Sequence, residues 1–366
     1  MQSTLQAIER SESLRLHVVA CGMHTLTSHG HTAGSIEAAG LSVDAVVPWQ
    51  ATTTPHGTAQ QTGSTIAALS KRLQRLRTQI VLVVGDRVEA LAAAVAGHLS
   101  GLVVAHVHGG DRAMGQADDS IRHAITKLSH LHFAATADSA ARIARLGEPR
   151  WRIRTVGTPG LDGIRGISAR WAAIAGLVPA DARRPRGYAL LVLHPTEPDP
   201  AVEMARAACA LQAVLSAGVP GCVIVHPNND PGSAGIMRAW SQVRDQRVVA
   251  YRNLAREEFL GLLCDAAMLV GNSSAGIIEA GAFGTPVIDI GPRQRGRLRG
   301  PNVRNVPWRL EAIRHAVATA WQSGRPRRYS PATHPWGAGR GAGRKIAQTL
   351  ASIQIDTRLL RKLIAY

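Results

Sequence analysis

The sequence predicts an α/β fold made of two doubly wound, Rossmann-like domains. Its 366 residues exceed the roughly 250 at which one hydrophobic core stops growing, so about two domains are expected. Short β-branched runs alternate with helical stretches along the whole chain, which is typical of parallel sheets covered by helices on both faces. Pro179, Pro185 and Gly187 interrupt this pattern and place the domain boundary within residues 165–187.

The alternation predicts the order of elements in both domains. The first domain should contain strands near residues 14–20, 45–48, 80–84, 103–108 and 131–136. Its helices should lie near residues 3–9, 64–77, 88–99, 118–129 and 138–145. The second should contain strands near residues 189–194, 223–227, 248–251, 268–270 and 286–290. Its helices should lie near residues 202–217, 235–243, 255–264 and 276–283. A last amphipathic helix should lie near residues 345–353. A doubly wound unit normally begins with a central strand, so a helix at residues 3–9 indicates that the first domain lacks its first strand.

These elements divide the chain into four expected parts. They are an N-terminal Rossmann-like domain (1–165), a linker (166–187), a C-terminal Rossmann-like domain (188–330), and a basic Gly/Pro-rich loop with a C-terminal helix (331–366). Gly/Arg-rich residues 293–304 and Pro/Gly/Arg-rich residues 325–344 are typical of flexible loops.

Composition excludes several classes of protein. No apolar run approaches the ~20 residues of a membrane-spanning helix, and the N-terminus has no secretory signal, so we expect a cytoplasmic protein that does not contact a membrane. The four cysteines form no C-x-x-C pair, which argues against a zinc ribbon or a disulfide framework. The net charge is +17 and only four of the 42 basic residues are lysines. Arginine suits bidentate phosphate contacts, although a coding bias toward arginine explains the excess equally well.

The excess of arginine does not by itself predict nucleic-acid binding. The arginines are spread along the chain rather than massed on one helix. Aromatic residues make up only 4% of the chain, and no zinc-finger or RNA-recognition motif accompanies them. A small anionic ligand therefore accounts for the charge as well as a polynucleotide does.

Polar clusters follow successive strands of the first domain. Gly85-Asp86-Arg87 and His106–Asp111 stand where strands should end, and Asp118–His123 opens a helix. Ligands of open α/β sheets bind at this carboxyl edge. The alternative is that Asp86 caps a helix and that Asp118 and Arg122 form a charged first turn. A metal site is not expected, because His106 and His108 have no third ligand nearby.

The second domain repeats this arrangement. His194-Pro195-Thr196 and His226–Asp230 follow strands, although each could be a simple Pro-terminated turn. In Gly271–Glu279 an apolar strand passes through small hydroxyl residues into a helix, and a helix N-terminus of this kind suits a phosphate. The alternative is a capped helix without a ligand. Arg293 follows the next strand and could reach the same anion, or lie in a solvated loop.

Taken together, these clusters resemble the UDP-N-acetylglucosamine 2-epimerase family, and most closely its hydrolysing branch, which forms N-acetylmannosamine for sialic-acid-type sugars. The resemblance covers about residues 5 to 353 in the order of the family. The matching segments are Gly85–Glu89, His106–Asp111, Asp118–Phe133, Val156–Asp162, Gly271–Glu279 and Gly284–Gln294.

The resemblance implies a GT-B arrangement with a UDP-sugar held in the cleft between the domains, no cofactor and no metal, and a homodimer. It implies loss of the proton at C2, expulsion of UDP to leave a 2-acetamidoglucal, and addition of water to give the C2-inverted free sugar. The implied catalytic residues are Asp86, Asp111, Asp118, Arg122 and His194. The implied substrate-binding residues are Arg87 at the diphosphate, His106, Asn228, Ser273, Ser274, Glu279 at the ribose and Arg293.

The sequence departs from the family at two places. The glycine-rich first strand and turn, which carries a phosphate-contacting arginine, would precede residue 1. At position 111 relatives of this branch usually have Glu, and the Asp111 carboxylate reaches ~1 Å less far, a displacement that can cost ~100-fold in rate. Four alternatives stay open: non-hydrolysing epimerisation, hydrolysis of a UDP- or GDP-linked 2,4-diacetamido sugar, glycosyl transfer, and binding of a nucleotide sugar without turnover.

Overall fold

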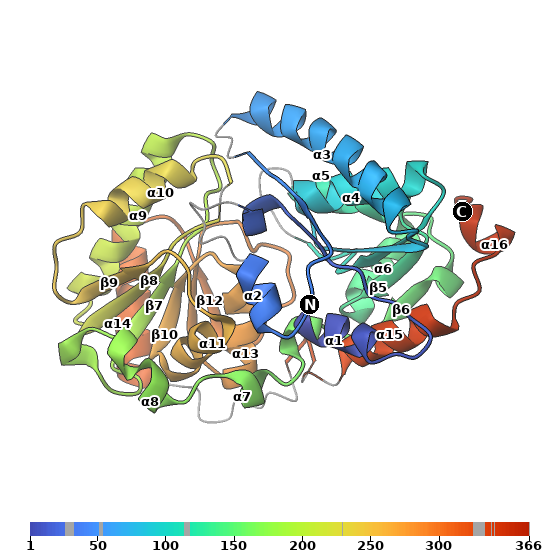
Figure 1. Cartoon of the computed structure of the whole chain (residues 1–366). Helices are drawn as coiled ribbons and strands as arrows, with labels where there is room; N and C mark the ends of the chain where they lie inside the picture. Colours follow the sequence, from blue (N-terminus) through green and yellow to red (C-terminus); the bar gives the residue numbers. More distant parts are fainter. Residues whose placement is uncertain are drawn as a thin grey trace. The chain divides into compact units, whose positions relative to one another are not determined.

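The chain divides into two α/β units in a computed structural model that describes residues 1–25, 33–50, 54–112, 118–228, 230–324, 334–337, 339 and 341–365. Unit 1 consists of Met1–Asp162 and Gly339–Tyr366, and unit 2 of Gly163–Ala338. Each is built on a parallel sheet with helices on its faces, the fold class that the sequence predicts (Figure 1). No helix among the described residues is long and apolar enough to span a bilayer.

The sheet of unit 1 has four parallel strands in the order β3-β4-β5-β6, and a separate parallel pair, β1-β2, lies in the same unit. Their bounds are β1 Val19–Cys21, β2 Ala45–Val47, β3 Ile80–Val84, β4 Val103–Val107, β5 Leu131–Ala134 and β6 Ile153–Thr155. Every residue of β4 and β5 is buried, which suits the continuous apolar runs of strands covered on both sides.

Helices cover both faces of the unit 1 sheet (Figure 1). On one face β3 and β4 share a core with α3 (Pro55–Arg75) and α4 (Val88–Leu99). On the other they share a core with α1 (Gln2–Glu9) and α15 (Ala342–Ser352). The unit also contains α2 (Ala33–Ala38), α5 (Asp118–Leu128), α6 (Ala137–Arg145) and α16 (Thr357–Leu360).

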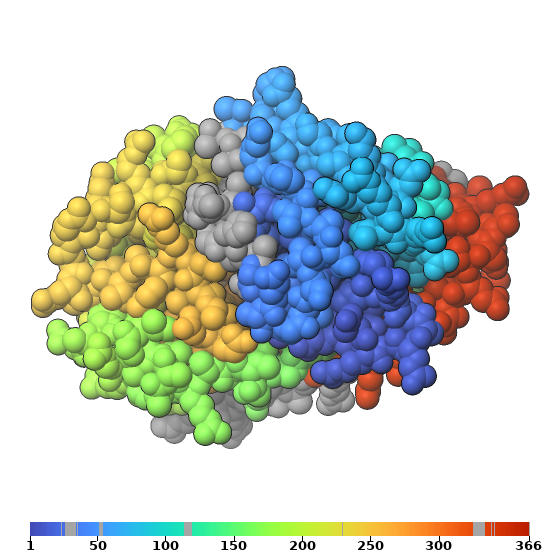
Figure 2. Space-filling model, viewed as in Figure 1, coloured from blue at the N-terminus to red at the C-terminus, as the bar shows by residue number. Residues whose placement is uncertain are grey.

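The C-terminal segment belongs to unit 1, whereas the sequence predicted a separate tail. Ile346 and Leu350 of α15 are buried in the same core as Ile8 of α1. The carboxylate of Asp162 accepts hydrogen bonds from the backbone N–H groups of Ala342 (2.9 Å) and Gly343 (2.8 Å) and so caps α15. Figure 2 shows the dark-blue surface of the first residues adjoining the red surface of the last ones.

Unit 2 has six parallel strands in the order β12-β11-β10-β7-β8-β9. Their bounds are β7 Tyr188–Val192, β8 Gly221–Val225, β9 Val248–Tyr251, β10 Met268–Gly271, β11 Val287–Ile290 and β12 Val303–Val306. The core on one face includes α9 (Pro200–Ser216), α10 (Ser233–Ser241) and α14 (Leu310–Ser323). The core on the other face includes α8 (Trp171–Ile174), α11 (Arg256–Asp265) and α13 (Glu279–Phe283).

Residues 166–187, which the sequence predicted to be a linker, are folded into unit 2. They continue from α7 (Ile164–Ile167) through α8. Ile174, Val178 and Ala182 are buried beside Tyr188 and Leu190 of β7. Their apolar side chains are the physical reason for the difference, because Pro and Gly in this stretch break the helices without preventing burial.

Candidate active site

The candidate site of unit 1 lies where β3 and β4 end. The side chain of Arg122, on α5, is only 2% exposed and forms an ion pair with Asp86, which follows β3. Its Nη1 donates to the carbonyl oxygen of His108, which follows β4, at 3.0 Å. Arg122 therefore ties together two neighbouring strand ends, and it leaves the Asp86 side chain 22% exposed.

A second group at the same edge joins His108, Asp111 and Ser139. One oxygen of Asp111 accepts from His108 Nδ1 at 2.8 Å, and the other accepts from Ser139 Oγ at 2.7 Å. Burial alone would raise the pKa of Asp111, but the charge and hydrogen bond of His108, the charge of Arg122 and the Ser139 hydrogen bond together lower it. Asp111 is thus an ionised carboxylate, 2% exposed, with both oxygens engaged by protein groups.

His108 occupies an unusual backbone position. Its φ of 65° lies in the left-handed region that a non-glycine residue adopts at a cost in energy. At Gly110, with φ 74°, an added Cβ would collide with the carbonyl oxygen of Ser139. Because Gly110 has no side chain, the turn after β4 can pack against α6, and this packing lets Ser139 of α6 reach Asp111.

His106 is a buried residue that holds the turn after β3 in place. It is 0% exposed, its Nε2 donates to the carbonyl oxygen of Gly85 at 2.8 Å, and its Nδ1 lies 3.3 Å from Thr126 Oγ1. Burial lowers the pKa of His106 to about 3. The ring is therefore neutral and fixes the turn that carries Asp86, and it has no exposed surface with which to meet a ligand.

The structure also places the two remaining predicted residues of this unit. Arg87 is the N-cap residue of α4, and its Nε lies 3.3 Å from the carboxylate of Glu89. Asp118 is the first residue of α5, and its side chain lies outside the described residues. The backbone thus brings Asp118 to the N-terminal end of the helix that carries Arg122.

The candidate site of unit 2 lies at the switch point of its sheet. From β7 the strand order runs through β8 and β9 in one direction and through β10, β11 and β12 in the other. Adjacent connections leave opposite faces of the sheet at such a point, and a crevice opens outside the carboxyl ends of the two strands. His194 follows β7, and Asn272-Ser273 follows β10. The predicted residues therefore stand where doubly wound sheets bind ligands.

Asn272 joins these two strand ends. Its Oδ1 accepts from the backbone N–H of His194 at 2.7 Å, and its Nδ2 donates to the carbonyl oxygen of His194 at 2.8 Å. Its own carbonyl oxygen accepts from Arg293 Nη1 (3.2 Å) and Gln294 Nε2 (2.8 Å). Asn272, which is 1% exposed, thus fixes both His194 and Arg293.

The remaining predicted residues of unit 2 lie around this link. Asn228, after β8, donates its backbone N–H to His194 Nδ1 at 3.3 Å. Ser273 is the N-cap of α12 (Ser274–Ile277), Ser274 is the first residue of that helix, and Glu279 begins α13. The predicted helix over 276–283 is thus two short helices. Local N–H and hydroxyl groups, rather than a long helix dipole, would hold an anion here.

Several structural residues of the site were not predicted. Ser139 and Asn272 are buried and bond to the predicted residues Asp111 and His194, and the buried Gln294 donates to the carbonyl oxygen of Asn272. Glu203, 1% exposed, accepts from the backbone N–H groups of Thr196 and Glu197, both at 2.9 Å, and holds the turn after β7. A usable signal existed for Asn272 alone, since it directly follows a strand within Gly271–Glu279.

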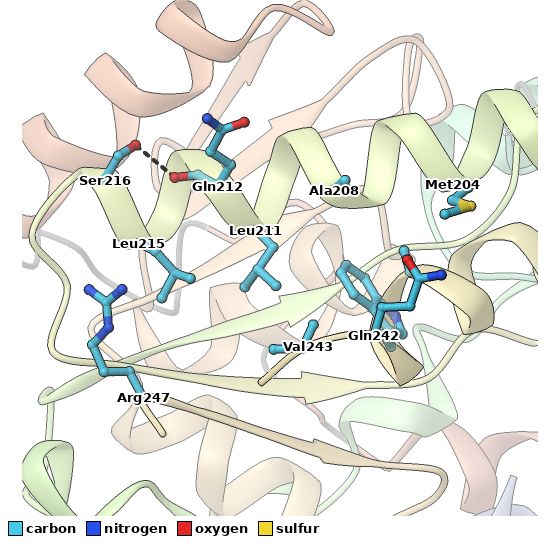
Figure 3. Close-up of a pocket in the computed structure, with 11 residues that line it drawn as sticks. Met204, Ala208, Leu211, Gln212, Leu215, Ser216, Gln242, Val243 and Arg247 are labelled. Atoms are coloured by element: carbon cyan, nitrogen blue, oxygen red, sulfur yellow. Dashed lines mark hydrogen bonds between the residues drawn. The ribbon is translucent and has the colours of Figure 1, made fainter. Parts of the chain in front are cut away.

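The described residues contain no group of three or more His, Cys, Asp or Glu side chains that could hold a metal ion. A cavity of about 550 Å³ in unit 2, shown in Figure 3, is lined by Leu211 and Leu215 of α9, Trp240 of α10, and Arg247 among others. None of the predicted site residues lines it, so we assign it no part in the chemistry.

Comparison with known proteins identifies the class to which this fold and these strand ends belong. The model of the UDP-N-acetylglucosamine 2-epimerase family matches residues 6–351. The chain belongs to this family.

Individual relatives agree with the assignment. The chain is 31% identical over 325 residues to the UDP-N-acetylglucosamine 2-epimerase of Neisseria meningitidis serogroup B, covering 89% of this chain and 85% of that protein. It is 31% identical over 375 residues to the UDP-N,N'-diacetylbacillosamine 2-epimerase (hydrolyzing) of Legionella pneumophila, covering 100% and 96%.

A solved structure agrees in fold. The Methanocaldococcus jannaschii UDP-GlcNAc 2-epimerase in complex with UDP-GlcNAc and UDP has a TM-score of 0.76 and 19% identity, over 95% of both chains. This likeness confirms the predicted fold class, two Rossmann-like domains of the GT-B type.

Proposed function

We propose that this protein is a hydrolysing UDP-N-acetylglucosamine 2-epimerase that releases UDP and N-acetylmannosamine. The observation that carries the proposal is the network at the carboxyl edge of unit 1. There Arg122, Asp86, His108 and Asp111 are linked directly after two adjacent strands. Such a set of fixed carboxylates beside a buried guanidinium suits proton transfer next to a departing anion.

In this proposal unit 2 holds the UDP group. His194, Asn228, Ser273, Ser274 and Arg293 supply donors around the switch point, and Glu279 holds the ribose. Asn272 supports this role because it holds both donors in place. Its side chain bonds to the backbone of His194, and its backbone carbonyl oxygen accepts from Arg293. Rigid donors lose little entropy when the diphosphate binds.

Unit 1 carries out the chemistry at the sugar. A carboxylate takes the proton from C2, the electrons form the C1=C2 double bond, and the C1–O bond breaks to release UDP. Arg87 and Arg293 stabilise the negative charge that UDP carries away. Water then adds to the 2-acetamidoglucal, its hydroxyl to C1 and a proton to C2 from the opposite face, which gives the inverted free sugar.

The geometry favours different roles for the three acids of unit 1. Asp86, partly exposed and oriented by Arg122, is suited to meet the sugar, and so is Asp118 at the start of α5. Asp111 has both oxygens bonded and almost no exposed surface. We therefore assign Asp111 to positioning His108, a role that does not require the longer reach of Glu. We assign His106 to positioning Asp86.

A second candidate substrate is a UDP-linked 2,4-diacetamido sugar. The Legionella relative, whose name states both that substrate and hydrolysis, is as similar as the Neisseria relative and covers the whole chain. Hydrolysis is common to both candidates, and the sugar substituent at C4 distinguishes them. We also propose that the enzyme acts as a homodimer in the cytoplasm.

Product analysis tests the proposal. Purified protein is incubated separately with UDP-N-acetylglucosamine and with the UDP-2,4-diacetamido sugar, and products are followed by NMR. Free N-acetylmannosamine with UDP supports the first candidate, and a free C2-inverted diacetamido sugar supports the second. UDP-N-acetylmannosamine would show non-hydrolysing epimerisation, turnover only with an added acceptor would show a transferase, and an unchanged bound ligand would show an inactive binder.

A further inference from the structure

A cluster of buried charges that the proposed function does not use lies at the amino edge of the unit 1 sheet, opposite the candidate site. One oxygen of Glu148, a residue 2% exposed, accepts from Lys127 Nζ at 2.7 Å and from Lys362 Nζ at 2.9 Å. Its other oxygen lies 3.1 Å from Nε2 of the fully buried His132. The cluster therefore joins α5, β5 and the segment that follows α16.

Lys362 uses every donor of its ammonium group within this cluster. Besides its contact with Glu148, its Nζ donates to the carbonyl oxygens of Thr126 at 2.9 Å and of Lys127 at 2.5 Å. An ammonium group has three N–H donors, so these three contacts account for all of them. Burial lowers the pKa of Lys362 to about 8, and the side chain therefore keeps its charge at neutral pH.

The two carbonyl groups that Lys362 contacts belong to the last turn of α5. The last carbonyl groups of a helix lack the partner that would continue the helix, and a positive charge beside them is favourable. Lys362 supplies this charge, and Glu148 holds the Lys127 side chain of the same turn. The C-terminal end of α5 is thus fixed by groups from outside the helix.

Thr126 connects this end of α5 with the candidate site. Its Oγ1 donates to the carbonyl oxygen of Arg122, about one turn earlier, at 3.0 Å, and it lies 3.3 Å from Nδ1 of His106. Arg122 in turn forms the ion pair with Asp86. A single residue therefore contacts Lys362 on one side and both supports of Asp86 on the other.

The segment that carries Lys362 is itself held in place. The guanidinium of Arg152, a residue 2% exposed, donates to three carbonyl oxygens of this segment, those of Leu359 (2.8 Å), Arg358 (2.9 Å) and Arg361 (3.1 Å). Leu359 is 1% exposed and lies in the core that includes α1 and α15. Because the backbone before Lys362 is fixed, its ammonium group contacts α5 from a rigid support.

The distance from this support to the site is short. From Thr126 to Arg122 an α-helix advances by only about 6 Å, so a shift at the last turn of α5 is passed on to the Arg122 backbone. A displacement of about 1 Å at a reacting group can cost about 100-fold in rate. A smaller shift of Arg122 therefore suffices for a measurable loss.

We propose that Lys362 is a positioning residue, which holds the C-terminal end of α5 and thereby orients Arg122 toward Asp86. This inference rests on the proposed function, because that function places Asp86 at the sugar. Lys362 acts through α5 and not on the sugar itself. The alternative is that Lys362 only stabilises unit 1.

The test compares the full chain with Lys362→Met, which keeps the length of the side chain and removes its charge. Glu148 retains Lys127 and His132 as partners, so we expect the variant to fold. Its kcat should fall by about 10-fold, whereas its affinity for UDP should stay within about two-fold, since the proposed function places UDP at unit 2. If Lys362→Met does not fold, Lys362→Gln, which keeps an N–H donor, takes its place.

Two further variants show that the charge at this place matters. Lys362→Arg keeps a cation and its donors, so it should keep kcat within about three-fold of the unaltered chain. Lys345→Met removes an exposed lysine of α15 and should leave kcat unchanged. Equal losses in the Met and Arg variants of Lys362 would contradict a role for the charge.

A double-substitution cycle distinguishes positioning from stabilisation. If Lys362 acts through Arg122, adding Lys362→Met to Arg122→Lys should lower kcat by no more than about two-fold further, because the group that Lys362 orients has already been replaced. The same 10-fold loss in both backgrounds, flagged here as an order of magnitude at about 10-fold, would show that Lys362 is a stabilising residue and would overturn the inference.

Hydrogen exchange measured by mass spectrometry tests the contact with α5 without any turnover. In Lys362→Met the amides of residues 122–128 should exchange at least about 10-fold faster, and those of α9 should not change. Faster exchange in α5 together with an unaltered chain that turns over neither candidate substrate would refute the proposed function and keep the link from Lys362 to α5. Unchanged exchange in α5, or an active unaltered chain with equal kcat in Lys362→Met, would overturn the inference.

Discussion

At the carboxyl edges of both sheets a side chain links two neighbouring strand ends, but the linking groups are ionisable in unit 1 and neutral in unit 2. In unit 1 the strand ends are joined by ionisable groups, with Arg122 on Asp86 and His108 on Asp111. In unit 2 they are joined by a neutral amide, Asn272, which holds His194 from both sides. The difference agrees with the proposed division of roles: ionisable groups such as those of unit 1 can transfer protons, whereas a neutral amide such as Asn272 can orient donors toward an anion without neutralising them.

The largest expected effect comes from removing Asp86 and Asp118, the acids that the proposed function places at the sugar. Asp86→Asn and Asp118→Asn should each lower kcat by about 10²- to 10⁴-fold, the usual contribution of a general acid or base. UDP affinity should stay within about two-fold, since the proposed function places these side chains at the sugar rather than at UDP. Steady-state kinetics with product detection by NMR measures the loss, and unaltered turnover in either variant would remove that residue from the site.

The next effect belongs to unit 2. Arg293→Ala should weaken UDP binding by about 10- to 100-fold, because a charge-assisted contact to a phosphate is lost. Arg247→Ala is the matched control, since Arg247 pairs with Asp245 beside the cavity of Figure 3. Isothermal titration with UDP compares the two, and equal affinities would place the diphosphate elsewhere.

Loss of the Asn272 amide should affect both stability and binding. Asn272→Ala removes the two hydrogen bonds from this side chain to the backbone N–H and C=O of His194, and we expect the free energy of unfolding to fall by about 2–4 kcal/mol. Urea unfolding measures this change. If stability fell but UDP affinity did not, Asn272 would be a structural residue only, and the comparison between the two edges would lose its second half.

The Asp111 network predicts a smaller effect that depends on pH. Ser139→Ala removes one of the hydrogen bonds that lower the pKa of Asp111, so that pKa should rise. The acidic limb of the kcat profile should move to higher pH, with kcat reduced by about 10-fold and KM little changed. Ser129→Ala deletes another buried hydroxyl of this unit outside the network and should not move the profile. An unshifted limb in Ser139→Ala would contradict the positioning role.

A further effect concerns the stability of unit 1 in acid. Because burial lowers the pKa of His106 to about 3, below its ordinary value of 6.5, the unfolded chain takes up this proton first as pH falls. The contribution to stability is therefore fully present above pH 6.5 and is lost between 6.5 and about 3. His106→Gln should reduce the slope of unfolding free energy against pH there by up to about 1.4 kcal/mol per unit. Equal slopes in the two proteins would contradict a neutral buried ring.

Much of the fold could be predicted because its central elements are strongly patterned. The predicted strand over 80–84 and helix over 88–99 have the same bounds in the structure, since apolar runs end there at Gly85 and Ser100. The strands β6 and β12 were not predicted because they are short, include arginine and lie at sheet edges. α14 was not predicted because it lies between two segments rich in Gly and Arg.

The site could be predicted only in part. Asp86, His108, His194 and Ser273 stand just after strands, and the local sequence is enough to predict that position. The supporting contacts depend on strand order, which pairs β7 with β10 although about 75 residues separate them along the chain. No local pattern could show that Asn272 holds His194, or that Ser139 on α6 reaches Asp111.

The proposed division of roles between the two edges is tested most directly by titrating UDP into three proteins: the unaltered chain, Asp86→Asn and His194→Ala. The account predicts that Asp86→Asn binds UDP as the unaltered chain does, whereas His194→Ala binds about 10-fold or more weakly. The opposite order, with UDP affinity lost in Asp86→Asn and kept in His194→Ala, would contradict it.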